Sequence, residues 1–381
     1  MCTFPKRFDA KKSGFSTLLA GLNCDMMEKK KEVLHMMKRL LLLVMMLCLL
    51  CACAPAAATV YTQESVTDCA NTSGVYNAFY AAGEVSHLVP GLKQDFVPQG
   101  VSYLPGQNWF IIAGYSGTDG VNSVIFAVDG ATGEMVKQTR LQNVDGSAYT
   151  GHAGGIAVTE KNLFISNNEH LYRISLEKYL ALPESADCAF DEAIPVPSRS
   201  SYCGYAEGVL WVGEFQYTGY LTDPSHKFKT EDGRHKAWLI GYKLDQTQEN
   251  ELAPAALTGE KATPDYIITT TERIQGMMIK DGQFYLCQSY GRRAPSTLLR
   301  YSNVLATEPR AHVELNGAQI PLWSLTSTEA TGEMIAPPTT ECLVTVDGGL
   351  YVLFESAAEK YMEPSNPSEN PMDRLFCLTG F

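Results

Sequence analysis

The sequence predicts an all-β protein, a β-propeller of five blades, and three observations support this prediction. A short strand–turn–strand phrase recurs along the chain. The second strand of each phrase is a nearly unbroken apolar run, which is typical of strands that are buried on both faces. Long amphipathic helical patterns are missing, apart from a short candidate at residues 176–186. Repeats at intervals of tens of residues indicate stacked β-sheet units.

The phrase is clearest in residues 275–286 and 341–352, which align without a gap. Both place an Asp-Gly turn between two runs of apolar, β-branched or aromatic residues, and this pattern predicts a β-hairpin. Three further copies align from Gln99, Gly154 and Ser201. The five copies predict five hairpins, each forming the inner half of one blade.

Each hairpin is followed by further strands that complete its blade. We expect third strands at residues 123–128, 170–176, 237–244, 297–301 and 374–378, and fourth strands at residues 135–141, 193–197, 266–271 and 311–315. The last blade has no fourth strand of its own. We therefore expect residues 83–88 to complete it, so that the N-terminal strand closes the ring. Six blades are the alternative, if residues 322–337 contain a degenerate unit.

The N-terminal region has the pattern of an export signal. A basic stretch at residues 29–39 precedes an apolar run at residues 40–50, which is short for a membrane-spanning helix. The run ends in Leu50-Cys51-Ala52-Cys53, which resembles the signal of bacterial lipoproteins. This resemblance implies that Cys53 becomes the lipidated N-terminus and that the protein is extracellular, anchored to the bacterial cell membrane. An ordinary signal peptide or an uncleaved anchor is the alternative.

These patterns divide the chain into an upstream extension with a signal peptide (1–53), a flexible tether (54–79) and the propeller (80–381). Of the 30 Lys and Arg and the 42 Asp and Glu residues, the first 53 positions hold nine and four, so the remainder has a net charge of −17. This acidity disfavours nucleic acid as a partner. The expected partners are the membrane, through the anchor, and a small molecule, glycan or peptide. We expect a monomer.

Six cysteines follow the predicted anchor, and an even number permits disulfides in an exported chain. Cys188 and Cys203 flank one connection between blades, and a disulfide between them would contribute about 3 kcal/mol. Cys69 is a possible partner of Cys377 if the tether runs beside the last blade. Cys287 and Cys342 are expected to be buried thiols.

Polar residues recur where a propeller exposes its central channel. First strands begin on the same face on which second and third strands are joined, so residues at both places converge there. At the first-strand starts these residues are Gln99, His152, Arg273, Gln275 and Glu341, and at the second-strand ends they are Tyr115, Asn167, Asn168, Glu214, Gln288, Tyr290, Arg292 and Glu355. Such a concave polar cluster predicts a ligand-binding site, for which we select Gln99, His152, Glu214, Arg273, Gln275, Arg292, Glu341 and Glu355. The alternative is that these side chains only cap backbone groups, bind water or form ion pairs.

The repeat phrase, over about residues 97–378, resembles the propellers of the NHL, gluconolactonase and strictosidine-synthase-like superfamily. In the gluconolactonase-like enzymes a divalent cation is held by a glutamate, asparagines and an aspartate. The resemblance implies that Glu341 with Asn167 or Asn168 would hold Ca²⁺, with His152 as the general base. This sequence has no aspartate at an equivalent position.

Three functions are therefore open. The first is a lipid-anchored, cell-surface propeller that binds a ligand at the channel face, without catalysis and without a cofactor. The second is a Ca²⁺-dependent hydrolase or lactonase, and the third is a structural envelope scaffold without a ligand. The sequence favours the first because it contains no complete catalytic motif. It does not identify the ligand.

Overall fold

The computed structural model describes residues 29–42 and 59–381, which belong to two separate units. Residues 29–42 form a helix, and the second unit, Val60–Phe381, is a β-propeller. None of the helices in these two stretches has the length and apolar character needed to cross a membrane. The lipoprotein-like motif that ends at Cys53 lies outside the described residues.

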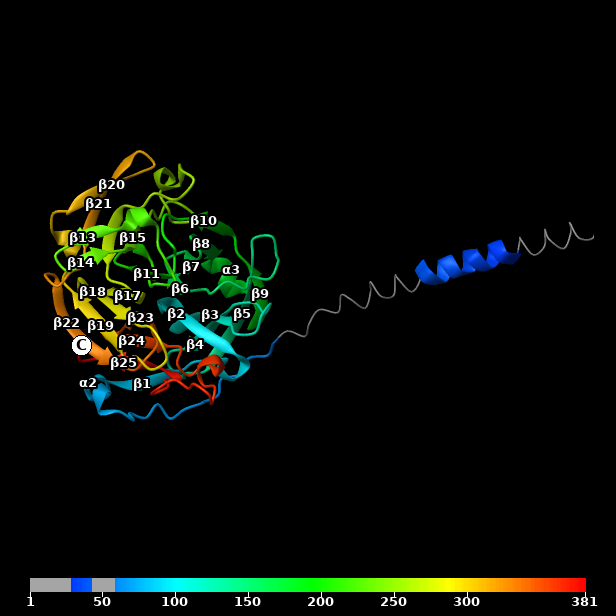
Figure 1. Cartoon of the computed structure of the whole chain (residues 1–381), viewed down its shortest axis with the longest axis horizontal. Coiled ribbons are helices and arrows are strands. Elements are labelled where there is room, and N and C mark those ends of the chain that lie inside the picture. Colours follow the sequence, from blue (N-terminus) through cyan, green and yellow to red (C-terminus); the bar gives the residue numbers. More distant parts are fainter. Residues whose placement is uncertain (1–28, 43–58) are drawn as a thin grey trace, which may run out of the picture. The chain divides into compact units, whose positions relative to one another are not determined.

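Five sheets, each built on four antiparallel strands, are arranged around one axis, so the predicted five-bladed propeller is confirmed (Figure 1). Blade 1 contains β2 (Phe96–Leu104), β3 (Trp109–Ser116), β4 (Val124–Asp129) and β5 (Met135–Gln142). Blade 2 contains β6 (Gly155–Val158), β7 (Asn162–Asn167), β8 (His170–Ser175) and β10 (Glu192–Pro195). Blade 3 contains β11 (Tyr202–Ala206), β12 (Val209–Gly213), β15 (Ala237–Lys243) and β16 (Tyr266–Thr270). Blade 4 contains β17 (Ile274–Lys280), β18 (Gln283–Gln288), β19 (Ser296–Tyr301) and β22 (Ala330–Ala336).

Blade 5 closes the ring with strands from both ends of the propeller. It contains β23 (Thr340–Val346), β24 (Gly349–Phe354), β25 (Arg374–Leu378) and, at its outer edge, β1 (Gly83–Leu88). In the pairing of β1 with β25, Gly83 lies opposite Leu378 and Val85 lies opposite Phe376. The closure predicted for residues 83–88 is therefore confirmed. The five inner strands contact one another in a circle, in the order β2, β6, β11, β17 and β23.

Glycines let the inner strands approach one another closely. A Cβ atom added to Gly155 would lie 2.3 Å from the backbone nitrogen of Cys203 in the next blade. A Cβ on Gly276 would lie 2.7 Å from the carbonyl oxygen of Glu341. Neighbouring blades are therefore in contact through their backbones at the inner strands, where only glycine fits.

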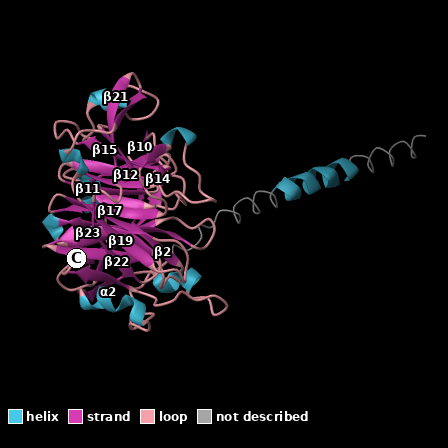
Figure 2. Cartoon of the chain, turned by 60° about the vertical axis from the view of Figure 1, so that its left-hand side comes forward, coloured by secondary structure: helices cyan, strands magenta, loops and turns pink. Residues whose placement is uncertain are grey.

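The hydrophobic core lies in layers between the blades. One layer joins Ile111 of blade 1 to Ile165 of blade 2, and another joins Phe164 of blade 2 to Val212 of blade 3. Successive residues of β7 thus face opposite layers, which explains why the second strands are apolar without alternation. Strands are the main regular element of the propeller, and the helices are short (Figure 2).

The outer edges of blades 1, 3 and 4 differ from the prediction. Residues 311–315, expected as the fourth strand of blade 4, form β20 (Ala311–Leu315), which extends blade 3 through β21 (Ala318–Ser324). The hairpin joins blade 3 because Ile320 and Leu322 add to the core layer between blades 2 and 3. The fourth strand of blade 4 is β22, which comes from the segment that was the candidate for a sixth blade. Blade 1 gains a parallel strand, β9 (Ser185–Ala189).

The remaining elements are small. The short helix predicted near residue 176 is present as α3 (Leu176–Ala181), and the hydroxyl of Ser175 caps it by accepting a hydrogen bond from the backbone N–H of Lys178. A second helix, α2 (Asn77–Ala81), precedes β1, and a hairpin of β13 (Phe228–Thr230) and β14 (Gly233–His235) lies in the β12–β15 connection.

The segment predicted as a flexible tether is packed against the propeller from Val60 onward, so this prediction is wrong for residues 60–79, which we call the strap. Tyr61 is buried and meets Phe126 of β4 edge to face, with ring centroids 5.2 Å apart. Phe79 is buried and stacks on Phe376 of β25 at 4.2 Å. A few aromatic anchors thus hold an otherwise polar segment in place.

The six cysteines of the propeller are free thiols, so the expected disulfide between Cys188 and Cys203 is not formed. The two side chains belong to different core layers, on either side of blade 2. Cys287 and Cys342 are buried, as predicted. Cys69 lies on the strap beside the last blade, but its thiol donates to the carboxylate of Asp373 at 3.2 Å.

Candidate functional site

Three predicted site residues occupy the same special position on their inner strands. In β2, β17 and β23 the pairing with the next strand slips by one residue, and the extra residues are Gln99, Gln275 and Glu341. A β-bulge of this kind leaves the extra residue out of the ladder and redirects its side chain. The sequence repeat places Gly154 and Ser201 at the equivalent positions of blades 2 and 3. The bulged polar side chains therefore come from the adjacent blades 4, 5 and 1.

These bulges bring together two glutamates, which we call the glutamate pair. Glu341 lies within hydrogen-bonding range of Glu355, which directly follows β24. The Nε2 atom of Gln275 donates to Glu341 at 3.0 Å, and the Nε2 atom of Gln99 donates to Glu355 at 2.9 Å. Glu341 is only 3% exposed and Glu355 only 8%, so both carboxyl groups are largely removed from water.

Burial raises the pKa of both glutamates, because an ionised carboxylate loses its hydration there. The negative charge of Glu355 raises the pKa of Glu341 further, well above its ordinary value. Hydrogen bonding from Tyr361 and the charge of Lys360 oppose the rise in the pKa of Glu355. Two desolvated carboxyl groups in contact do not both ionise readily, so the pair retains a proton at a pH where isolated carboxyl groups have lost theirs. The pair can therefore both donate and accept hydrogen bonds.

An aromatic and cationic rim adjoins the pair. Lys360 donates to the hydroxyl of Tyr115 at 2.7 Å, and the ring of Tyr115 lies 4.6 Å from that of His152. The imidazole remains exposed. Nearby protein atoms and the charge of Lys360 lower the pKa of His152, so the ring is neutral at neutral pH and can accept a proton.

Sequence reasoning missed Lys360 and Tyr361. Both belong to a 3₁₀ turn, η7 (Glu359–Tyr361), inside the long connection between β24 and β25. No strand periodicity fixes the position of such loop residues. The available signal was the excess length of this loop directly after Glu355, because long loops on rigid scaffolds often carry binding residues.

The two predicted arginines stack on tyrosines. Arg292 lies 4.8 Å from the ring centroid of Tyr361 and thereby supports the loop that carries Lys360. Arg273 lies 4.7 Å from the ring centroid of Tyr217 and 5.8 Å from that of Tyr290. In the part of the chain that the structure describes, neither arginine forms an ion pair with the glutamate pair.

Glu214 lies at the strand end that the sequence predicted, but its contacts do not include the glutamate pair. It directly follows β12, is fully buried, and accepts hydrogen bonds from the backbone N–H groups of Arg199 and Trp238, each at 2.9 Å. Its carboxylate also contacts the Nδ1 atom of His226 at 2.9 Å. It lines a cavity between blades 2 and 3 that shares no lining residue with the glutamate pair.

The residues proposed as calcium ligands are not joined in this structure. Asn167 ends β7 with its amide beside Gly151, and Asn168 occupies the following turn with φ 46°. Glu341 is engaged with Gln275 and Glu355 instead. Over residues 29–42 and 59–381, no group of three or more His, Cys, Asp or Glu side chains is placed to hold a metal ion. The calcium site stays a prediction.

No protein-family model and no curated protein matches the chain. Solved structures do resemble it. Glutaminyl cyclase from Myxococcus xanthus is 12% identical, with 77% of this chain and 93% of that chain covered and a TM-score of 0.38. A GH43_1 enzyme from Xanthomonas citri is 9% identical, with 80% and 92% covered and a TM-score of 0.42. Likeness at these levels says nothing about the ligand or chemistry of this protein, and the superfamily resemblance noted above stays a prediction.

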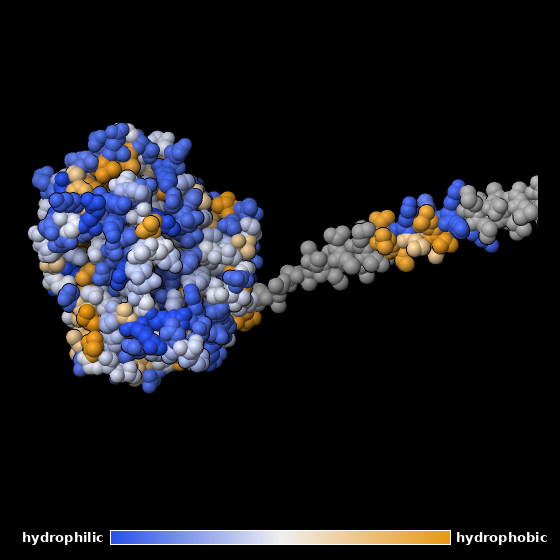
Figure 3. Space-filling model, in the orientation of Figure 1, coloured by the Kyte–Doolittle hydropathy of each residue, from blue (hydrophilic) through white to orange (hydrophobic). Residues whose placement is uncertain are grey.

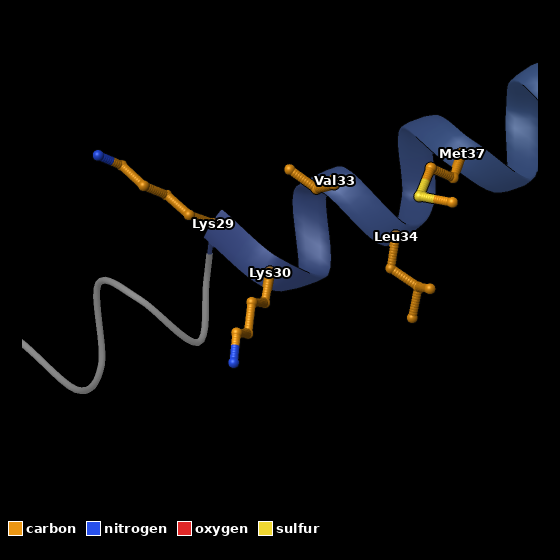
Figure 4. Close-up of a pocket in the computed structure, with 5 residues that line it drawn as sticks. All are labelled: Lys29, Lys30, Val33, Leu34 and Met37. Carbon is orange, nitrogen blue, oxygen red and sulfur yellow. The ribbon is translucent and has the colours of Figure 1, made fainter.

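A depression on the helix of residues 29–42 is lined by Lys29, Lys30, Val33, Leu34 and Met37 (Figure 4). Because all five residues belong to one helix, it is an open groove along that helix. The propeller face in Figure 3 is mostly hydrophilic with scattered apolar residues.

Proposed function

We propose that the protein binds a small polar ligand of sugar or peptide type at the mouth of the propeller channel. The glutamate pair supports this proposal, because it is a desolvated pair with raised pKa values and receives amide partners from the bulges of two neighbouring blades. Together with Gln99 and Gln275, it offers donors and acceptors side by side, which complement hydroxyl and amide groups. The half-buried rings of Tyr115 and Tyr361 add apolar surface.

A purely structural role explains the pair less well. Burying two carboxyl groups beside each other costs stability, and apolar residues or two glutamines would hold the blades together without that cost. Proteins retain such unfavourable electrostatic arrangements mainly at functional sites.

The same pair favours a second candidate function, hydrolysis by general acid–base chemistry. A glutamic acid with a raised pKa can donate a proton to a leaving group at neutral pH. His152, whose pKa is lowered, can accept a proton from the attacking water. In this version of the hydrolase no metal ion is required.

A thermal-shift screen tests the binding proposal. The full chain and its Glu341→Gln variant are melted with a panel of mono- and disaccharides and dipeptides, with Glu314→Gln, an exposed glutamate of β20, as the matched control. We expect a compound that raises the melting temperature of the wild type and the control, and that binds Glu341→Gln about tenfold or more weakly. If no compound shifts the wild type, or all three proteins respond equally, the proposal is wrong.

A calcium-dependent reaction makes a separate prediction. If Ca²⁺ binds the native state, adding it should raise the melting temperature and EDTA should lower it. At a hundredfold excess of Ca²⁺ over its Kd, the free energy of unfolding should rise by about 2.7 kcal/mol. The measurement needs only the protein, CaCl₂ and EDTA. An unchanged melting temperature would count against the calcium enzyme and leave the metal-free proposal intact.

We also propose that the chain is exported and lipid-anchored through Cys53. The support is the basic stretch, the apolar run and the tetrapeptide that ends at this cysteine. Cys53→Ser should move the protein from the membrane to the soluble or unprocessed fraction and abolish incorporation of labelled fatty acid. Cys51→Ser is the matched control and should remain anchored. Retention of the label in Cys53→Ser would refute the assignment.

A further inference from the structure

A second cavity, of about 390 Å³, lies between blades 2 and 3, and we call it the interblade cavity. It lies among the β7–β8 turn, the segment that leads into β11 and the long β12–β15 loop. Its charged and hydroxyl-bearing lining residues are Glu169, Ser198, Arg199, Glu214, Thr222, Asp223, Ser225, His226 and Lys261. This volume falls within the range of small-molecule sites.

One wall carries an imidazole in a fixed orientation. Glu214, held by two backbone N–H groups, contacts the Nδ1 atom of His226 at 2.9 Å. The ring of His226 lies flat on that of Trp238, with centroids 3.7 Å apart and planes 15° apart. The Nε2 atom of His226 has no hydrogen-bond partner among the described residues. A carboxylate that holds Nδ1 leaves Nε2 as a basic acceptor.

Arg199 supplies a cation that no carboxylate neutralises. It is half-buried, and its Nη1 atom donates to the backbone carbonyl of Leu221 at 3.0 Å. Within residues 29–42 and 59–381 it forms no ion pair, whereas the other cation of the cavity, Lys261, is paired with Glu169 at 2.6 Å. A guanidinium with spare donors in a cavity is well suited to bind a carboxylate.

Asp223 supplies the opposite charge. Its Oδ1 atom accepts hydrogen bonds from the backbone nitrogen and the hydroxyl of Ser225, at 2.8 and 2.7 Å. These bonds fix the carboxylate at the start of the 3₁₀ turn η4 (Pro224–His226). In the described part of the chain its other oxygen has no partner. The cavity therefore presents a positioned cation, a positioned anion and a basic nitrogen.

We propose that the interblade cavity is a second ligand site, independent of the channel, for a small zwitterion with one carboxylate and one amino group. A free amino acid and a short peptide are such molecules. Arg199 binds the carboxylate, and Asp223 together with the Nε2 atom of His226 accepts hydrogen bonds from the ammonium group. A purely anionic ligand would leave Asp223 without a partner, and a purely cationic ligand would leave Arg199 without one.

Titration calorimetry and saturation-transfer NMR test this site on the full chain, with free L-amino acids and dipeptides as probes. Arg199→Gln removes the guanidinium but keeps the backbone N–H that binds Glu214, and it should weaken binding about tenfold or more. Arg234→Gln changes an exposed arginine of β14 and should bind like the wild type. Glu341→Gln should also bind normally, because the channel site is separate.

A second variant probes the amino group. Asp223→Asn keeps an acceptor for Ser225 and should weaken binding of the amino acid, but not that of the same carboxylic acid without its amino group.

Three results would each overturn the proposal. These are the absence of saturable binding by every probe, unchanged binding by Arg199→Gln, and equally tight binding of succinate or inorganic phosphate.

Discussion

At the scale of single residues, the glutamate pair depends on one slip in strand register. In blade 5, Thr340 lies opposite Phe354 and Cys342 lies opposite Leu353, so Glu341 has no partner in the ladder. Without the bulge, the strict alternation of a strand would assign this side chain to one of the two apolar layers beside the blade. The bulge instead allows it to meet Glu355, which follows the neighbouring strand.

Glu341→Gln should alter how stability depends on pH. In the wild type the pKa of the folded pair is raised above the ordinary value of 4.5, so above that pH the native state binds more protons than the unfolded chain. Relative to the variant, the wild type should be most stable below about pH 4.5 and should lose stability as the pH rises through the raised pKa. The loss amounts to about 1.4 kcal/mol for each unit of pKa shift.

Urea unfolding of both proteins between about pH 4.5 and about pH 8.5 measures this difference. Glu314→Gln again serves as the control, because its side chain is exposed. Curves that run parallel for the wild type and Glu341→Gln would show that the pKa of the pair is not raised.

The sequence predicted four members of this cluster, Gln99, Gln275, Glu341 and Glu355, because the repeat aligns them at the ends of strands. It also assigned Glu214, at the equivalent place in blade 3, to the same site, but a repeat position does not determine which side chains pack against it. Glu214 belongs to the interblade cavity because the β12–β15 loop folds back and places His226 against it.

At the scale of elements, the inner strands hold the ring together through direct backbone contact. Gly155→Ala should be severely destabilising, because the new methyl group would lie 2.3 Å from the backbone nitrogen of Cys203. Backbone atoms of two packed strands cannot move aside at low cost, so we expect a loss of about 3 kcal/mol or more in the free energy of unfolding. Gly106→Ala meets no atom within 4 Å and should change it by less than about 1 kcal/mol. Equal effects in denaturant unfolding would contradict this packing.

The inner hairpins and most outer strands were predictable, but the fourth strand of blade 4 and the additional edge strands of blades 1 and 3 were not, for a physical reason. Inner strands are buried on both faces, so their apolar runs identify them in the sequence. Outer strands such as β20 and β22 are partly exposed, and their partners are decided by which neighbouring edge is free. That choice depends on contacts distant in sequence, which a local pattern does not encode.

At the scale of the whole molecule, the strap ties the N-terminal side of the propeller to blade 5. The fully buried carboxylate of Asp373 accepts hydrogen bonds from the backbone nitrogens of Val66 and Thr67 at 2.8 and 3.1 Å, and from the hydroxyl of Ser65 at 2.9 Å. No sequence pattern predicts this attachment, because the strap is mostly small and polar and its main partner lies about 300 positions later.

Asp373→Ala should release the strap. The backbone N–H groups of Val66 and Thr67 and the hydroxyl of Ser65 would lose their shared acceptor, and the free energy of unfolding should fall by about 3 kcal/mol. Chymotrypsin, which cleaves after aromatic residues, should then cut near Tyr76 faster than in the wild type. Asp68→Ala is the matched control on the strap, because Asp68 is exposed and accepts only from the backbone of Ala70 at 3.0 Å. Equal cleavage rates in the two variants would refute this role of Asp373.

The pairing of β1 with β25 also sets an order of events during biosynthesis. Gly83 is synthesised about 300 residues before its partner Leu378. Bringing together partners so distant along the chain is slow, and until it happens the partially assembled chain exposes unpaired strand edges. Blade 5 is therefore the last blade for which all four strands become available.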